Sequence, residues 1–201
     1  MRGVLITVEG VEGSGKSTQC RRLAERLQAR GLGVVLTSEP DGTPLGAAIR
    51  TLFETAASPP TPLTQVFLFM AARQQHAAEV IRPALSRGAV VISDRYDHSS
   101  LAYQGTGAER AWITTLNARA RRPDLTIFLR VRAEVAAERR VAAGRAQELF
   151  EDLAMQRRVA AGYDEVLAAL AAAGEAITVL DGERPLDEVT AAIVSSVMHA
   201  L

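Results

Sequence analysis

The sequence of 201 residues has one cysteine, one tryptophan and one lysine. A single cysteine excludes an intramolecular disulfide, and Cys20, in helical phase with Leu23 and Leu27, is expected to be a small core residue rather than a reactive thiol. No hydrophobic run approaches the length of a transmembrane helix, and the N-terminal residues lead into a strand pattern rather than a signal peptide. We therefore expect a cytoplasmic protein that does not act at a membrane.

An excess of either charge is also missing. Basic and acidic residues each number 23, and the formal net charge is +0. This balance argues against general binding of nucleic acids or membrane surfaces. The length fits one large domain, and no linker or repeat divides residues 1–201.

Short β-branched segments alternate along the chain with longer segments of helical periodicity. The pattern predicts strands buried on both faces at residues 3–9, 33–39, 89–95, 125–131 and 176–182. Helices are expected at residues 16–30, 45–55, 64–86, 108–120, 133–143, about 151–173, and 186–199. Such alternation predicts a three-layer α/β fold, with a five-stranded parallel sheet covered by helices on both faces.

The only lysine, Lys16, follows the first predicted strand. Residues 10–17 read GVEGSGKS, a complete match to the phosphate-binding pattern GxxxxGK[ST] between a strand and a helix. Lys16 would reach the β- and γ-phosphates of ATP as a compact charge, where the planar group of arginine does not fit, and Ser17 would ligate Mg²⁺. The residues expected to bind ATP here are Gly10, Val11, Glu12, Gly13, Ser14, Gly15, Lys16, Ser17 and Thr18.

Other polar clusters indicate which class of P-loop protein this is. The segments SEPDGTP and DRYDHSS follow the second and third predicted strands, and parallel sheets bind ligands beyond the carboxyl ends of their strands. A GTPase would need the guanine-reading motif Asn-Lys-x-Asp, which a chain with one lysine in the P-loop cannot contain. The size favours a small phosphotransferase.

Six segments resemble motifs of the bacterial thymidylate kinases in the same order: EGVEGSGKST, SEPDGTPLGAAIR, LFMAARQQH, IRPAL, DRYDHSSLAYQG and RRPDLTIFL. The resemblance covers essentially the whole chain, and DRY followed by SSLAYQG is its most specific part. It implies transfer of a phosphoryl group from Mg-ATP to dTMP by a homodimer. Ser38 and Asp41 depart from the family pattern, which often has arginine and glycine at these positions.

The resemblance also implies roles for individual residues in binding the acceptor. Phe69 would stack on the thymine ring, with core packing as the alternative, and Arg73, one helical turn later, would hydrogen-bond the base. Arg95 would hold the dTMP phosphate, and Asp94 would lie near Mg²⁺. The remaining acceptor-binding residues would be Glu12 near the 3′-hydroxyl, Ser100 and Gln104 near the base or its phosphate, and Tyr103 against the sugar C2′.

One expected residue is missing from the P-loop. A subgroup of the family carries an arginine where this chain has Gly13, so the resemblance places a catalytic arginine in a lid at about residues 139–152. Arg145 is the first candidate and Arg140 the second, with a solvated helix face as the alternative for each. Lys16, Arg95 and the lid arginine would neutralise charge on the transferred group, and no general base is needed because the acceptor is already an anion. Arg184 lies in a segment that resembles the loop bordering adenine.

Two other functions remain open at this point. The chain could phosphorylate a different nucleotide or a deoxynucleoside, because the phosphate-binding loop does not identify the acceptor. It could also be an ATP-binding module without catalytic activity, since its lid sequence GRAQELFED lacks the usual Asp-Arg-x-Glu spacing.

Overall fold

A five-stranded sheet forms the centre of the structure, a computed structural model that describes residues 2–144 and 153–201. All neighbouring strands are parallel, in the order β2-β3-β1-β4-β5. The strands are β1 (Val4–Glu9), β2 (Val34–Ser38), β3 (Val90–Asp94), β4 (Leu125–Arg130) and β5 (Ile177–Asp181). The predicted number and parallel direction of the strands are confirmed for these residues.

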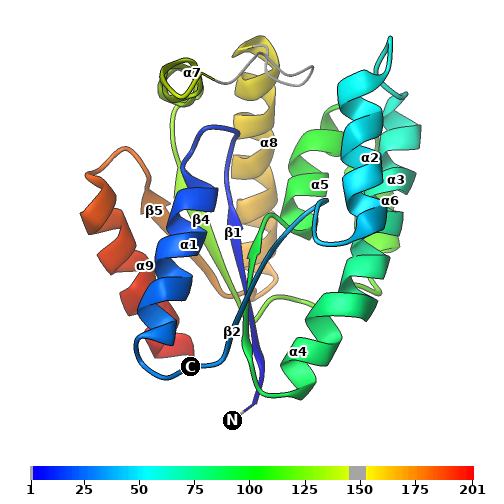
Figure 1. The fold of residues 1–201 in the computed structure, drawn as a ribbon. Coiled ribbons are helices and arrows are strands. Elements are labelled where there is room, and N and C mark those ends of the chain that lie inside the picture. The colour runs from blue at the N-terminus through cyan, green and yellow to red at the C-terminus, as the bar shows by residue number, and fades with distance from the viewer. Residues whose placement is uncertain (1, 145–152) are drawn as a thin grey trace.

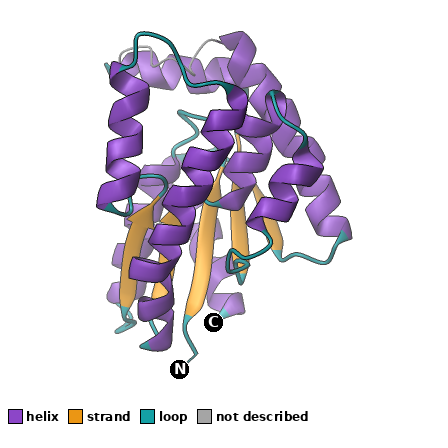
Figure 2. Cartoon of the chain, turned by 90° about the vertical axis from the view of Figure 1, so that its right-hand side faces the viewer, coloured by secondary structure: helices purple, strands orange, loops and turns teal. Residues whose placement is uncertain are grey.

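Helices pack on both faces of this sheet, which confirms the predicted layers (Figures 1 and 2). The α-helices are α1 (Lys16–Gln28), α2 (Pro44–Thr55), α3 (Pro62–His76), α4 (Arg82–Ser86), α5 (Asp97–Tyr103), α6 (Arg110–Asn117), α7 (Ala133–Ala142), α8 (Leu153–Ala172) and α9 (Leu186–Ala200). A π-helical turn, η1, spans Ala77–Ile81, and a 3₁₀ turn, η2, spans Gln104–Thr106. Both chain termini lie at the end of the sheet opposite to α7 (Figure 1).

The core has two sides because β1 is buried along its whole length. Ile6 and Val8 pack on the side of α1 and α9, where Leu23 and Ile193 lie in the same cluster. Leu5 belongs to the cluster on the opposite side, together with Ile81 and Tyr96. A continuous hydrophobic run in a strand is what burial by helices on both faces requires.

The predicted helices differ from the structure at two places. The single helix expected at residues 64–86 is divided by η1, in which the backbone N–H of Arg82 reaches back to the carbonyl of Ala77. Pro83 follows directly and has no N–H to donate, which breaks the regular helical ladder. Helix α5 was not expected, because its polar residues give no apolar periodicity; five of its seven residues are nevertheless buried.

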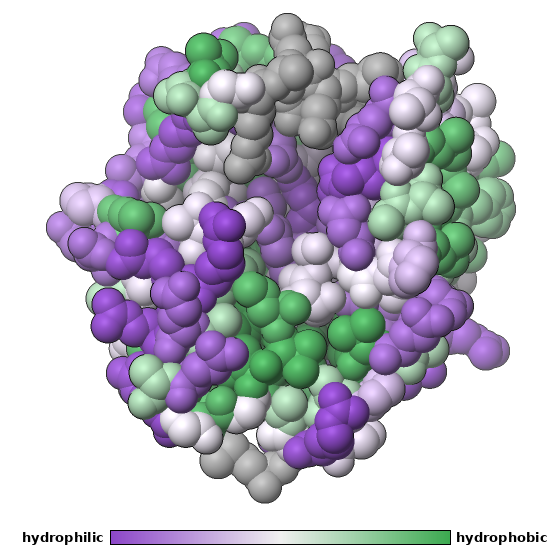
Figure 3. Space-filling view, in the orientation of Figure 1, coloured by the Kyte–Doolittle hydropathy of each residue, from purple (hydrophilic) through white to green (hydrophobic). Residues whose placement is uncertain are grey.

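The edge of the sheet at β2 is partly open. Leu36 of β2 is 43% exposed. Figure 3 shows a hydrophobic area in its lower centre, over the part of the sheet between α1 and α4. No helix among the described residues is long and hydrophobic enough to span a membrane.

Two glycines provide a matched test of the packing around the loop after β2. A Cβ atom at Gly46 would lie 1.6 Å from the carbonyl oxygen of Pro40, whereas one at Gly33 would meet nothing within 4 Å. We predict that Gly46→Ala lowers the free energy of unfolding by about 2 kcal/mol or more, despite the better helix propensity of alanine. The melting temperature should fall by about 5 °C. Gly33→Ala, the control, should leave it unchanged or slightly raised; equal melting temperatures for the two variants would contradict this packing.

Candidate active site

The loop between β1 and α1 has the backbone of a phosphate-binding loop. The φ angles of Gly10, Gly13 and Gly15 are 149°, 86° and 95°, values that residues other than glycine rarely adopt. Lys16 begins α1, is 4% exposed, and donates a hydrogen bond of 2.8 Å from Nζ to the carbonyl oxygen of Val11. Burial lowers the pKa of Lys16. The ammonium group therefore lies across the mouth of its own loop, where phosphate oxygens would compensate for its lost hydration.

Ser17 and Asp94 meet beside this loop. The Ser17 hydroxyl donates a hydrogen bond to Oδ2 of Asp94, which ends β3. Oδ1 of Asp94 is buried and has no hydrogen-bond partner among the described residues, and a buried carboxylate oxygen normally has one. One hydroxyl and one carboxylate fit Mg²⁺, which retains several waters and binds substrate phosphates. The described residues contain no cluster of three or more metal-ligating His, Cys, Asp or Glu side chains.

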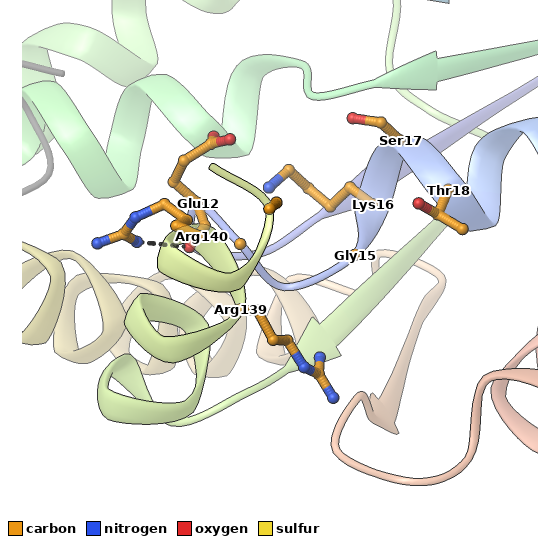
Figure 4. Close-up of a pocket in the computed structure, with 9 residues that line it drawn as sticks. Glu12, Gly15, Lys16, Ser17, Thr18, Arg139 and Arg140 are labelled. Carbon is orange, nitrogen blue, oxygen red and sulfur yellow. Dashed lines mark hydrogen bonds between the residues drawn. The ribbon is translucent and has the colours of Figure 1, made fainter. Parts of the chain in front are cut away.

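Helix α7 covers the loop from above (Figure 1). A Cβ atom at Gly13 would lie 2.3 Å from the carbonyl oxygen of Ala136, so no side chain fits there while α7 holds this position. Arg140 donates a hydrogen bond of 2.9 Å to the carbonyl oxygen of Glu12, and Arg139 donates one of 2.9 Å to the carbonyl oxygen of Gly182. Figure 4 shows Arg140 beside Glu12 and Arg139 pointing away from Lys16.

The P-loop, the start of α1 and the end of α7 line a cavity of about 220 Å³. Its lining consists of Glu12, Gly13, Gly15, Lys16, Ser17, Thr18, Arg139, Arg140 and Ala143. Arg145, the first candidate for a lid arginine, lies outside the described residues, as does the rest of the expected lid from 145 to 152. Arg184 is not among the lining residues and pairs with Glu188 at 2.6 Å on the surface.

Arg95 extends from the next strand end toward the same loop. It is the only residue other than glycine with a positive φ in the described chain, at 73°. Its guanidinium group donates hydrogen bonds to Glu12, to Ser99 at 3.2 Å and to Tyr103 at 3.2 Å, and it lies 4.9 Å from the centre of the Tyr103 ring. Three residues predicted to bind the acceptor, Glu12, Arg95 and Tyr103, are thus in direct contact.

Arg73 lies in a second, deeper polar cluster. Its side chain is 2% exposed and donates to Glu39 through Nε at 2.9 Å and Nη2 at 2.6 Å. It also donates to Asn117 Oδ1 at 2.8 Å and to Ser100 Oγ at 3.0 Å. Arg73 and Ser100, both predicted to bind the acceptor, are therefore in contact. Glu39 and Asn117, which the sequence did not indicate, accept hydrogen bonds from Arg73.

The other residues predicted to bind the base lie on neighbouring elements. Phe69 is half-buried on α3 and stacks on Phe53 of α2, with ring centres 5.4 Å apart. Gln104 begins η2 and is 6% exposed. The stacking on Phe53 is compatible with the core role that was the alternative for Phe69.

Glu9 is the most buried carboxylate near the site, and the sequence analysis missed it. It is 0% exposed at the end of β1 and accepts hydrogen bonds from the backbone of Tyr96 (2.8 Å) and Ser99 (3.3 Å). It also accepts from the hydroxyls of Ser99 (2.7 Å) and Tyr163 (2.9 Å). Burial raises the pKa of Glu9. The sequence signal that could have indicated Glu9 is an acidic residue at the end of the hydrophobic run of β1.

His98 is buried among acidic groups next to Glu9. Its Nε2 lies 3.1 Å from Glu175, and its Nδ1 lies 3.6 Å from Asp97 and 3.9 Å from Glu9. Burial alone would lower the pKa of His98, but Asp97 and the other two carboxylates together raise it to about 9. The imidazole is therefore positively charged at neutral pH and offsets part of the buried negative charge.

Comparison with known proteins gives one consistent result. A sequence model described as thymidylate kinase matches residues 8–193. A thymidylate kinase of Pseudomonas fluorescens is 45% identical over 199 residues, which cover 96% of this chain and 94% of the relative. The thymidylate kinase of Caulobacter vibrioides is 43% identical over an alignment of 208 positions, which covers 100% of this chain and 98% of the relative. That of Deinococcus radiodurans is 40% identical over 202 positions, which cover 98% of this chain and 97% of the relative.

The match includes the P-loop, both polar clusters and all five strands except the first residues of β1. Its extent and the identity to relatives of nearly the same length confirm the family that the motifs predicted. The chain belongs to the thymidylate kinase family.

Proposed function

We propose that the protein transfers the γ-phosphoryl group of ATP to dTMP, giving ADP and dTDP for nucleotide biosynthesis. The observation that carries the proposal is the contact of Arg95 with Glu12, because it joins the arginine predicted to bind the acceptor to the phosphate-binding loop. Family membership supports the choice of acceptor. An oxygen of the dTMP phosphate would form the new bond to the γ-phosphorus, while the bond to the bridging oxygen breaks and ADP leaves with the electron pair.

The residues of the loop account for the donor side of this reaction. The loop N–H groups and Lys16 would hold the β- and γ-phosphates, with Lys16 exchanging the Val11 carbonyl for phosphate oxygens. Ser17 and Asp94 would hold Mg²⁺, which when bound neutralises charge on the phosphates. No side chain has to remove a proton, because the attacking phosphate oxygen is already anionic.

We further propose that an arginine from the α7 side completes the charge around the transferred group. Arg140 is the described candidate, since it lines the cavity and contacts the carbonyl of Glu12. Arg145 remains the first choice from the sequence. The position of α7 over Gly13 explains why the P-loop itself carries no arginine, since Ala136 occupies the space next to Gly13.

The acceptor base would bind between α3 and α5. Arg73 donates hydrogen bonds to Glu39 and Asn117, so its guanidinium group has a fixed orientation. Phe69 would contribute a ring face, Ser100 and Gln104 would lie near the base or its phosphate, and Tyr103 would disfavour a ribose 2′-hydroxyl. Arg184 remains a proposed neighbour of adenine.

We also propose a cytoplasmic homodimer. Exposed hydrophobic side chains gather on α2 and α3, where Leu52, Leu63 and Phe67 are 44%, 53% and 52% exposed. Figure 3 shows hydrophobic residues at its right-hand edge, over these two helices. Several large hydrophobic side chains exposed on neighbouring helices are a feature of protein–protein interfaces.

The choice of acceptor predicts the outcome of an ADP-release assay. With ATP and Mg²⁺ present, dTMP should give the highest kcat/KM among dTMP, dUMP, dCMP, AMP and thymidine. A higher value for another acceptor would support the kinase of a different substrate. Tight ATP binding without transfer to any of the five would support the non-catalytic module.

The role of Lys16 predicts the effect of its most conservative replacement. Lys16→Arg keeps the positive charge but places a wide planar group in a position that is 4% exposed. We expect kcat to fall about 100-fold or more. Arg2→Lys, at an exposed site in which Arg2 pairs with Asp124, is the control and should leave kcat unchanged. A kcat for Lys16→Arg within a factor of about two of wild type would contradict the role of this lysine.

A further inference from the structure

We infer that Glu9 is a positioning residue for the acceptor, acting on Arg95 through Ser99. The inference rests on the proposed function, because it requires that Arg95 hold the acceptor phosphate. Glu9 itself is 0% exposed and lies beneath the turn that carries Arg95, so it acts through other side chains.

The turn after β3 has a backbone conformation that needs support. Arg95 has a φ of 73°, a conformation that costs energy in a residue other than glycine and persists only when neighbouring contacts hold it. Glu9 Oε1 accepts the backbone N–H groups of Tyr96 and Ser99, the first of which directly follows Arg95. One buried carboxylate oxygen therefore fixes both the turn and the start of α5.

The side chain of Ser99 lies between Glu9 and Arg95. Its hydroxyl donates a hydrogen bond of 2.7 Å to Glu9 Oε2, and its Oγ accepts one from Arg95 Nη1 at 3.2 Å while lying 2.9 Å from the Tyr163 hydroxyl. The guanidinium of Arg95 can only donate and a carboxylate can only accept, so Ser99 links the two groups. Tyr163 of α8 donates to the same oxygen and prevents its rotation.

The position of Arg95 matters for binding the acceptor. Arg95 is shared between Ser99 on one nitrogen and Glu12 and Tyr103 on the other, so losing the Ser99 contact frees one side of the guanidinium. A guanidinium that is no longer preorganised binds a phosphate less tightly. The effect should fall on the KM for dTMP, because Arg95 would hold the acceptor phosphate, whereas Lys16 and Ser17 would hold the phosphates of ATP and their Mg²⁺.

Glu9→Gln and Ser99→Ala test this order of contacts. In Glu9→Gln the amide oxygen can still accept both backbone N–H groups, but its NH₂ group must donate to the Ser99 hydroxyl and competes there with Arg95. We expect each variant to raise the KM for dTMP about tenfold and to leave the KM for ATP unchanged. The double variant should match either single variant, since both changes act on one contact.

Two reference variants make the result decisive. Arg95→Ala should raise the KM for dTMP more than Glu9→Gln does. Thr126→Val removes a buried hydroxyl that contacts Thr7 at 3.0 Å in the same sheet, and it should lower the melting temperature without changing either KM. If Arg95→Ala leaves the KM for dTMP unchanged, the assignment of Arg95 fails, and this inference fails with it.

If Arg95→Ala raises that KM but Ser99→Ala and Glu9→Gln do not, the inference alone is overturned. It is also overturned if the two variants raise both KM values together or combine additively, as independent losses of structure would. Ser99→Ala carries the test if Glu9→Gln does not fold, because it leaves the buried carboxylate and its backbone contacts in place.

Discussion

The pairing of β1 with β3 is the constraint on which the site depends. These strands are distant in sequence but adjacent in the sheet, with Val8 opposite Asp94. Because both strands end at the same edge, the residues that follow them must meet. Three contacts result: Ser17 with Asp94, Glu12 with Arg95, and Glu9 with the backbone of Tyr96. The residues proposed to bind the donor and the acceptor are thereby brought together at one edge of the sheet.

The close approach of α7 explains a feature of the loop that its motif leaves open. The pattern GxxxxGK[ST] accepts any residue at position 13, but here the carbonyl oxygen of Ala136 occupies the space where a side chain would begin. The helix brings Arg139 and Arg140 to the cavity instead. Positive charge at this cavity is thus supplied by α7, where the loop itself has no room for a side chain.

The sequence predicted those parts of the structure that depend on local patterns. Hydrophobic runs located the five strands, and the glycine-rich motif located Lys16 and Ser17 before any contact was known. The residues that it missed, Glu39, Asn117 and Glu9, act through partners between 34 and 154 positions away. No periodicity or spacing encodes such pairs, because they depend on how strands and helices pack. Helix α5 was missed for a related reason: its buried polar residues have distant partners, with Ser99 bonded to Glu9, Ser100 to Arg73 and His98 next to Glu175.

The most direct test of this account is the position of the acceptor phosphate in a crystal structure with ADP, Mg²⁺ and dTMP bound. We predict that this phosphate lies against the guanidinium group of Arg95 and faces the P-loop. Ser17 and Asp94 should hold the Mg²⁺ ion. A phosphate bound away from Arg95, or a metal ion that contacts neither Ser17 nor Asp94, would contradict this account.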